Sequence, residues 1–533
     1  MAKNRNDVIS KVYWCATTVA LMCFPIRYAS ASSCEDLKSL KLPNTSIDIA
    51  EVVKAGAFKA PATEAPQGGA PPAADNARDA NVRTAATFAK LPAFCRVSGS
   101  IRPTPDSNIK FEVWMPTDNW NQRFEEVGSG GFAGSIIYRS MAEALDSGYA
   151  TTNTDTGHGS EPNGEAAWGG HPEKVVDFGY RAVHETTVKA KSIISAFYGS
   201  GPKFSYWNGC SEGGRQGMTE AERFPNDFNG IIAGDPVFDF THGQTRGIWN
   251  NIQVYKEPDS YLTPVDYALI HHAVLDQCDE ADGVKDGVVN NPEQCHFNPS
   301  ILLCKEGKTP GCLSAAQVLG ITAQLSPLVD SQTHRVITNG QMPGFEVFHM
   351  TRPDPAPDKL KSVKISPFYA YFVFNDPDWD WTTFDLQRDL PIADKKFAKT
   401  LNSYDPDLKA FKAAGGKLIS YHGWADFGPS PLNTLDYFKK VQTVVGESSA
   451  FYRLFMIPGM GHCAGGPGTD QFDKMAAITG WVEHGTAPNS LIASHLTKGK
   501  VDRTRPLCAY PEIAKYKGTG STDDAANFMC GKP

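Results

Sequence analysis

The sequence predicts an α/β fold whose pattern of strands and helices is interrupted by a large insertion. From about residue 109 to 238, short runs with strand character alternate with runs of helical spacing. The alternation stops between about 240 and 400, where Asp, Pro and aromatic residues are frequent, and it resumes near residue 415. With 533 residues, 41% of them hydrophobic, the chain can bury such a core and also carry the insertion.

The elements of the predicted core follow one another in order. Alternating or continuous apolar runs indicate the strands, and the run at 124–127 leads into a glycine-rich loop at 128–134. Helical spacing covers 178–197 and ends at a glycine-rich stop. Strands are expected at 109–115, 124–127, 149–153, 204–208, 417–421 and within 450–459.

The first 31 residues predict a secretory signal peptide. Three Lys or Arg residues precede an apolar run at 12–26, and Ala-Ser-Ala at 29–31 is a small-residue cleavage site. The apolar run is too short to span a membrane. A buried N-terminal helix is the alternative, while the bulky Met22 disfavours lipoprotein processing at Cys23. We therefore expect a secreted or periplasmic protein with no membrane partner after cleavage.

The net charge and the number of cysteines indicate which partners to exclude and predict disulfide bonds. The formal net charge is −8 and no run is rich in Lys or Arg, so a nucleic-acid partner is not expected. Ten cysteines follow residue 31, an even number that in an exported chain predicts disulfide bonds. Spacing alone does not fix the pairing. Near neighbours suggest Cys278–Cys295, Cys304–Cys312 and Cys508–Cys530, which leaves Cys34, Cys95, Cys210 and Cys463.

Residues 209–213 form a Gly-x-Ser-x-Gly motif centred on Ser211. A strand leads into the motif and a helix-like run to Phe224 leads out of it, which is the nucleophile elbow of α/β-hydrolases. The small neighbours permit a strained backbone, and the hydroxyl stands at a helix N-terminus, where backbone N–H groups face developing negative charge. A serine that merely caps the helix is the alternative.

An elbow serine needs a base and an orienting carboxylate, in the chain order Ser, Asp or Glu, His. His462 follows a strand-like run and a Pro-Gly turn, which is a natural position for the base. Asp426 lies just past the strand at 417–421 and is the best carboxylate, with Asp405 and Asp407 in reserve. The alternatives are a solvated loop histidine and a turn-forming aspartate.

Two of the remaining cysteines flank the predicted nucleophile and base. Cys210 directly precedes Ser211, and Cys463 directly follows His462. A bond between them would hold their Cα atoms within about 7 Å and join the elbow to the loop of the base. We therefore expect Cys210–Cys463, which leaves Cys34–Cys95 as the last pair.

This constellation resembles the tannase and feruloyl esterase family of secreted serine esterases. Segments 461–468 and 504–518 are also similar to that family, so the resemblance covers most of the chain after the signal peptide. It implies an α/β-hydrolase core at 32–238 and 405–533, with a lid at 239–404. The residues that match the family arrangement CS–D–HC are Cys210, Ser211, Asp426, His462 and Cys463.

The mechanism also requires an oxyanion hole. One donor is expected to be the backbone N–H of Glu212, the residue after the nucleophile. The second is expected from the loop at 128–134, and the resemblance places it at Gly131, with Gly130 as the neighbouring alternative. A plain tight turn is the other interpretation of this loop.

Residues 278–291 form an Asp/Gly-rich loop that can wrap a hard cation. It is not an EF-hand, because the twelfth position from Asp279 is Asn290 and not Glu. A solvated turn is the alternative. The resemblance implies a structural calcium ion in the lid, whose ligands transfer to the side chains of Asp279, Asp282 and Asp286 and the carbonyls of Val284 and Val288.

The resemblance implies a carboxylic ester hydrolase that acts on small aromatic esters, such as plant-wall esters of phenolic acids. The acyl group stays open between ferulate, p-coumarate, gallate (a tannase) and the terephthalate monoester cleaved by mono(2-hydroxyethyl) terephthalate hydrolase, another family member. That last enzyme uses a lid arginine, for which Arg388 is the nearest but not a secure counterpart. The aromatic run 367–381 either lines the acyl pocket or packs the core of the lid.

Two alternatives come from other functional classes. A calcium-dependent carbohydrate-binding protein with a dead hydrolase fold is disfavoured by the intact Ser, Asp and His set. A serine peptidase on the same fold is disfavoured by the family resemblance, and a peptide-substrate assay separates it from an esterase.

Overall fold

The computed structural model describes residues 31–61, 86–159, 166–350 and 366–533. The predicted signal peptide falls on 1–30, outside the described residues, except for its last residue, Ala31. Among the described residues, no helix combines the length and the apolar character that crossing a bilayer requires.

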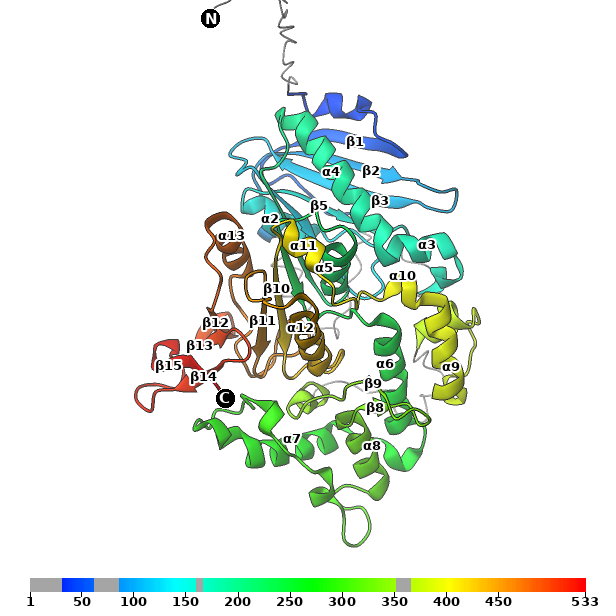
Figure 1. Cartoon of the computed structure of the whole chain (residues 1–533), viewed down its shortest axis with the longest axis vertical. Helices are drawn as coiled ribbons and strands as arrows, with labels where there is room; N and C mark the ends of the chain where they lie inside the picture. Colours follow the sequence, from blue (N-terminus) through cyan, green and yellow to red (C-terminus); the bar gives the residue numbers. More distant parts are fainter. Residues whose placement is uncertain (1–30, 62–85, 160–165, 351–365) are drawn as a thin grey trace, which may run out of the picture.

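A nine-stranded sheet runs through the described part of the molecule in the spatial order β1-β2-β3-β5-β4-β6-β7-β10-β11 (Figure 1). Pairs from β1 to β5 are antiparallel, and pairs from β5 to β11 are parallel. The parallel half confirms the predicted α/β class. The strands are β1 Thr45–Val53, β2 Phe94–Ile101, β3 Ile109–Pro116, β4 Arg123–Val127, β5 Ala150–Thr154, β6 Phe204–Cys210, β7 Gly230–Gly234, β10 Lys417–Gly423 and β11 Tyr452–Ile457.

The central parallel strands are buried on both faces, which explains their apolar and small residues. Strand β7, for example, reads Gly-Ile-Ile-Ala-Gly and is buried at every position. Strand β7, and the strands β1 and β2 of the antiparallel edge, are not among the strands predicted from the sequence. Strand β1 carries exposed and half-buried residues, so its sequence lacks the apolar signal of a core strand.

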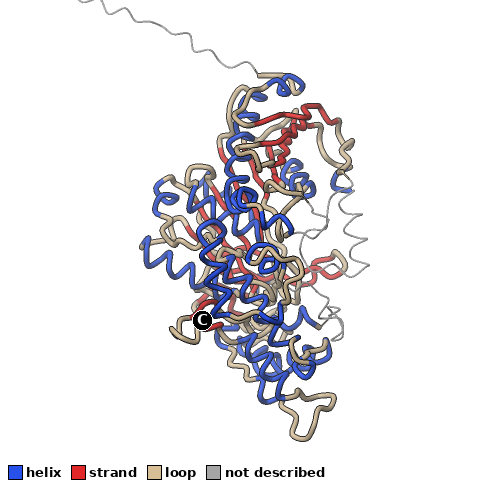
Figure 2. The backbone as a smooth tube through the Cα atoms, turned by 90° about the vertical axis from the view of Figure 1, so that its right-hand side faces the viewer, coloured by secondary structure: helices blue, strands red, loops and turns tan. Residues whose placement is uncertain are grey.

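Helices lie outside the strands of the sheet, and the end of the molecule far from β1 consists mostly of helices and loops, with the short strands β8 Leu328–Val329 and β9 Val336–Thr338 among them (Figure 1 and Figure 2). Helix α4 ends at Gly199, which has φ 75°, a left-handed conformation that favours glycine. In the core, the helices are α2 Tyr138–Asp146, α3 Pro172–Val176, α4 Ala182–Tyr198, α5 Glu212–Arg223, α11 Lys409–Ala413, α12 Pro431–Val445 and α13 Lys474–His484.

Between β7 and β10 the chain leaves the sheet, over the stretch predicted to form the lid. Capping boxes at Thr263 and Ser314 begin two of its helices, because each side chain accepts the backbone N–H three residues later. Its elements are α6 Phe240–Tyr255, α7 Pro264–Cys278, α8 Ala315–Leu325, β8 Leu328–Val329, β9 Val336–Thr338, α9 Leu386–Ala393 and α10 Lys399–Leu401.

Five disulfide bonds cross-link the described chain, with Cα–Cα distances between 5.0 and 6.0 Å. One joins β2 to the N-terminal segment, two lie in the stretch predicted to form the lid, and one ties the C-terminal strands β13 Lys500–Cys508 and β15 Phe528–Gly531. These two strands pair with β12 Ser490–Thr497 and β14 Ile513–Tyr516, respectively. The five pairs are those predicted from the sequence: 34–95, 210–463, 278–295, 304–312 and 508–530.

Candidate active site

Four neighbouring parallel strands end at the same edge of the sheet, and a polar candidate residue follows each of them. In the register, Cys210 of β6 pairs with Gly234 of β7, and Gly423 of β10 pairs with Ile457 of β11. Because the carboxyl ends of parallel strands align, the loops that follow them converge. The residues placed there are Ser211, Asp235, Asp426 and His462.

Ser211 occupies the tight turn between β6 and α5. Its backbone has φ 63° and ψ −119°, a strained conformation for a residue with a side chain. The turn needs glycine neighbours, since a Cβ on Gly209 would lie 2.5 Å from the carbonyl oxygen of Gly213. The structure thus forms the elbow that the motif predicts.

The elbow serine, the predicted base and the predicted carboxylate form one hydrogen-bonded chain. Nε2 of His462 lies 2.7 Å from Oγ of Ser211, and its Nδ1 lies 2.7 Å from Oδ2 of the fully buried Asp426. The other carboxylate oxygen accepts the backbone N–H of Gly428 at 2.7 Å. The geometry lets the imidazole take the serine proton while the carboxylate holds the ring.

The same contacts shift the pKa values of Asp426 and His462 in opposite directions. Burial by itself would raise the pKa of Asp426, but attraction to His462 and hydrogen bonds from His422 and His462 lower it below its usual range. Burial would lower the pKa of His462, but the charge of Asp426 raises it. The site therefore stabilises the imidazolium that forms when the base takes a proton.

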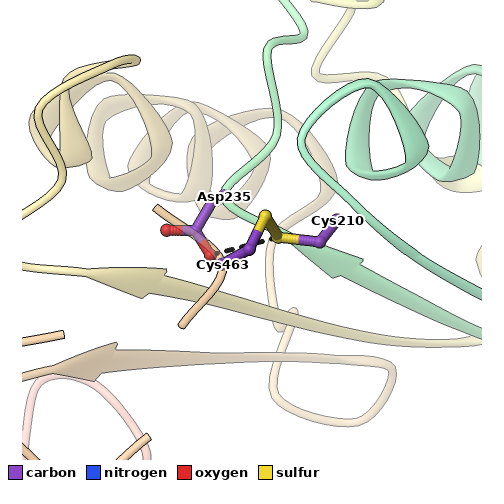
Figure 3. A group of neighbouring side chains, drawn as sticks. All are labelled: Cys210, Asp235 and Cys463. Carbon is purple, nitrogen blue, oxygen red and sulfur yellow. Dashed lines mark hydrogen bonds between the residues drawn. A yellow bond between two sulfur atoms is a disulfide. The ribbon is translucent and has the colours of Figure 1, made fainter. Parts of the chain in front are cut away.

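The disulfide Cys210–Cys463 joins the elbow to the loop of the base (Figure 3). Its Cα atoms are 6.0 Å apart. Figure 3 also shows Asp235 beside the bond, with Oδ2 3.4 Å from Sγ of Cys210. Because the bond links the residue before Ser211 to the residue after His462, it fixes the separation of the two reacting side chains.

Comparison with known proteins decides the family. A family model described as tannase and feruloyl esterase matches residues 95–531. The chain belongs to the tannase and feruloyl esterase family. An uncharacterised esterase of Xanthomonas campestris pv. campestris is 36% identical over 94% of this chain and 92% of its own length. A probable feruloyl esterase B-2 of Aspergillus terreus is 34% identical, over 82% of this chain and 86% of its own.

Solved structures of the tannase and feruloyl esterase family share the architecture. The crystal structure of feruloyl esterase B from Aspergillus oryzae is 29% identical, with a TM-score of 0.80 over 93% of this chain and 99% of that one. The tannin acyl hydrolase of Aspergillus niger, at 23% identity, shares the fold with a TM-score of 0.72 over 94% and 95% of the two chains. The resemblance inferred from the CS–D–HC residues is confirmed.

The glycine-rich loop at 128–134 packs directly against the elbow. A Cβ on Gly128 would lie 2.6 Å from Cα of Gly213 in the first turn of α5. The N–H of Ser129 donates to Oε1 of Gln216 on the same helix at 3.1 Å. Gly131 has φ 58°, which a residue with a side chain adopts only with strain. The loop that carries the predicted donor therefore lies beside Ser211.

A buried histidine, which the sequence patterns do not single out, holds the far end of this loop. Nε2 of His158 lies 2.6 Å from the carbonyl oxygen of Phe132. Burial lowers the pKa of His158 to about 4, so the ring is neutral at pH 7 and donates to that carbonyl. On the other side, Nδ2 of Asn153 donates to the carbonyl of Val127 at 2.6 Å.

Glu212 places its backbone N–H at the start of α5 and turns its side chain into the protein. The buried carboxylate accepts Nε of Arg215 at 3.0 and 2.9 Å. Arg215 also donates to the carbonyls of Gly179 and Leu401, and Leu401 ends α10 of the lid. This arginine, which the motif does not reveal, ties the elbow helix to the end of the stretch predicted to form the lid.

A second buried pair lies behind the triad and is also missed by the sequence patterns. Nε2 of His422 is 3.2 Å from Oδ2 of Asp426 and 3.7 Å from Oδ1 of Asp235. Burial raises the pKa of Asp235, with repulsion from Asp426 adding to the effect and the two histidines opposing it. The only available signal is position, since Asp235 directly follows β7 at the edge that carries the triad.

The predicted calcium loop packs against strand β13. Oδ2 of Asp286 lies 2.5 Å from Nη2 of Arg505 on this strand. The carboxylate of Asp279 accepts the backbone N–H groups of Asp286 and Gly287, each at 3.1 Å. Asp282 accepts the N–H of Val284 at 3.0 Å. The side-chain oxygens of the three aspartates do not all lie within 4.8 Å of one another, so calcium binding stays a prediction.

The aromatic run of the lid is packed in a core. Residues Phe368–Val373 are all buried, in a cluster with Phe132, Phe178 and Phe240, which favours the packing interpretation. Arg388 is 57% exposed and pairs with Asp389, so its guanidinium is already engaged.

A cavity of about 390 Å³ lies next to the triad, between α6 and the loop after β10. Its walls include Phe427 and Gly428, which follow Asp426 in the chain, and Val237, whose N–H donates to the carbonyl of Ser211 at 3.4 Å. The ring of Phe427 is 6.4 Å from that of His462. Ser211 and His462 do not line the cavity themselves, so it adjoins the reacting atoms without containing them.

Proposed function

We propose that this protein is a serine carboxylic ester hydrolase that cleaves esters of phenolic acids. The observation that carries the proposal is the hydrogen-bonded chain Ser211–His462–Asp426 on an elbow turn, in a member of the tannase and feruloyl esterase family. Relatives named feruloyl esterase B, one aligned over most of this chain and one superposed on it, support the phenolic acyl class.

The geometry supports an acyl-enzyme route. Oγ of Ser211 attacks the ester carbonyl carbon while His462 takes its proton, and Asp426 stabilises the imidazolium. The N–H groups of Glu212 and Gly131 are the proposed donors to the tetrahedral oxyanion. The imidazolium then protonates the leaving alcohol, and water activated by the same histidine releases the acid.

A hydrolysis panel tests the proposal. The purified mature protein is offered methyl ferulate, methyl p-coumarate, methyl gallate, chlorogenate and the terephthalate monoester, with Ser211→Ala as the control. We expect hydrolysis of the hydroxycinnamate esters by the wild-type protein only. Preference for gallate would indicate a tannase. Binding of the esters without turnover would support the dead hydrolase, and cleavage of peptides in place of esters would support a peptidase.

We also propose that the loop 278–291 holds a structural calcium ion. Three carboxylates share one Asp/Gly loop, and carboxylate oxygens are the ligands that a hard cation such as calcium prefers. The residues that would hold the ion are Asp279, Asp282, Val284, Asp286 and Val288.

Export to an oxidising compartment is a further part of the proposal. It is supported by the basic and apolar pattern of residues 1–31 and by the five disulfide bonds, which persist outside reducing compartments.

A further inference from the structure

We propose that His184, Glu220 and Asp227 bind one divalent transition-metal ion, for which Zn²⁺ is the probe. The three residues come from helix α4, from helix α5 and from the turn between α5 and strand β7. One potential ligand atom of each residue lies within 4.8 Å of those of the other two. An ion at this position would tie two core helices to the turn that leads into β7. The proposal goes beyond ester hydrolysis and does not depend on it.

The carboxylate of Glu220 is the observation that carries the proposal. Glu220 is 1% exposed, and neither of its carboxylate oxygens has a hydrogen-bond partner in the described chain. Burying an unpaired carboxylate is unfavourable, so buried charges in proteins are normally paired or coordinate a metal ion. Because one oxygen of Glu220 lies within 4.8 Å of ligand atoms of both His184 and Asp227, the unpaired carboxylate is directed at the two other candidate ligands.

His184 and Asp227 form the accessible side of the site. Nδ1 of His184 lies 2.6 Å from Oδ2 of Asp227, and their side chains are 31% and 16% exposed, so an ion can reach them from solvent. The ring of His184 stacks on Phe224, with 3.8 Å between centroids, which fixes its orientation. Bonds of about 2.1 Å put neighbouring tetrahedral zinc ligands roughly 3.4 Å apart, so this pair would open by less than about 1 Å.

The charges around the site favour a bound cation. The carboxylate of the fully buried Glu126, whose Oε1 has no hydrogen-bond partner in the described chain, repels that of Glu220. The ammonium group of Lys191 attracts Glu220, but it donates to the backbone carbonyl of Asp227 and not to a carboxylate. When all three acids are ionised, they carry two net negative charges together with Lys191 and a neutral His184. A divalent ion would balance these charges.

The set of donor atoms selects among metal ions. Zn²⁺ binds imidazole nitrogen together with carboxylate oxygen, and it often takes three protein ligands and one water. Ca²⁺ and Mg²⁺ prefer oxygen ligands, so the histidine disfavours them. Glu220 lies nine residues after Ser211, about 13 Å along α5, so the ion should stabilise the fold without entering the reaction.

Calorimetric titration of the full mature protein with Zn²⁺ tests the site. Metals are first removed with a chelator, and calcium is then restored so that the proposed site in loop 278–291 does not compete. We expect one Zn²⁺ per chain, binding that excess Mg²⁺ does not displace, and a melting temperature that rises with the Zn²⁺ concentration. A proton shared by Glu220 and Asp227 is the other way to neutralise the buried carboxylate. A protein that binds no stoichiometric Zn²⁺ would favour that proton and overturn the proposal.

Two variants assign the bound ion to these residues. Glu220→Gln keeps the shape of the side chain but removes the carboxylate. It should weaken Zn²⁺ binding by more than the roughly 10- to 100-fold that the loss of an outer-shell partner costs. Because it also removes an unpaired buried charge, the metal-free variant should melt no lower than the metal-free wild type. His184→Ala should weaken Zn²⁺ binding to a similar extent.

The matched control is another His–Asp pair with a similar contact. Nδ1 of His495 lies 2.7 Å from Oδ1 of Asp502, but no third ligand completes a group with them in the described chain. His495→Ala should therefore bind Zn²⁺ like the wild type.

Three results would overturn the site. The first is unchanged Zn²⁺ affinity in Glu220→Gln, and the second is a loss in His495→Ala equal to that in His184→Ala. The third is a loss in Asp282→Ala with none in Glu220→Gln, which would place the ion in the loop 278–291.

Discussion

At the scale of single residues, Ser211 combines a strained backbone with a hydroxyl group that is hydrogen-bonded to the predicted base, His462. Its φ is 63°, and its Oγ lies 2.7 Å from Nε2 of His462. Because the side chain acts through chemistry and not packing, Ser211→Ala should lower kcat by roughly 10⁴–10⁶-fold and leave the melting temperature near that of the wild type. Initial rates on methyl ferulate measure the loss in kcat, and a thermal melt measures the melting temperature. A folded variant that keeps more than a few per cent of the activity would contradict the assignment.

Asp235 should set the pH range of the base. Its negative charge contributes to the raised pKa of His462. Asn at this position carries no charge, but it can still accept the N–H of Gly423, which lies 3.0 Å from Oδ1 of Asp235 in the wild-type protein. The base must be neutral to take a proton, so activity rises as pH increases through its pKa. Asp235→Asn lowers that pKa and should move the acid limb of kcat/KM to lower pH, and a shift to higher pH would count against this role.

At the scale of elements, the bond Cys210–Cys463 should matter more for catalysis than for global stability. It closes a loop of 253 residues, which by chain entropy suggests several kcal/mol, yet four other bonds and a large core already restrain the chain. A misplacement of ~1 Å between Ser211 and His462 can cost on the order of 100-fold in rate. Cys210→Ala/Cys463→Ala should therefore fold and lose most activity on every ester.

The lid bond Cys304–Cys312 provides the matched control. Its removal takes away one disulfide without touching the loops of the triad, so Cys304→Ala/Cys312→Ala should keep near-normal turnover. The catalytic role of the bond Cys210–Cys463 would be refuted if Cys210→Ala/Cys463→Ala also kept near-normal turnover. It would equally be refuted if peptide mapping of the wild-type protein found either of these two cysteines as a free thiol.

The sequence predicts those parts of the site that lie in one local pattern. The motif around Ser211 lies between a strand and a helix, and the cysteines beside Ser211 and His462 identify their own bond. By contrast, Asp235 meets His422 only through the register of β7 and β10. Arg215 pairs with nearby Glu212, but it reaches the carbonyl of Leu401 only because the stretch predicted to form the lid folds back onto the elbow helix. Strand β1 is missed because all of its residues are exposed or half-buried, so its sequence lacks the apolar pattern of a core strand.

At the scale of the whole molecule, the proposed calcium ion should stabilise the lid and leave the chemistry largely untouched. The loop 278–291 packs on β13 through Asp286 and Arg505, while the triad lies at the strand ends of β6, β10 and β11. Prolonged chelation should therefore lower the melting temperature more than the initial rate, and Asp282→Ala should reproduce the effect. Native protein without bound calcium by elemental analysis would exclude the site.

The central claim is that Ser211 is the nucleophile, and labelling tests it most directly. The wild-type protein is treated with an aryl fluorophosphonate, which reacts with activated serines, and the adduct is located by intact mass and peptide mapping while hydrolysis of methyl ferulate is followed. We expect one adduct per chain, on Ser211, formed in step with the loss of activity and absent from the Ser211→Ala protein. An adduct on another residue that accompanies the loss of activity would contradict the account.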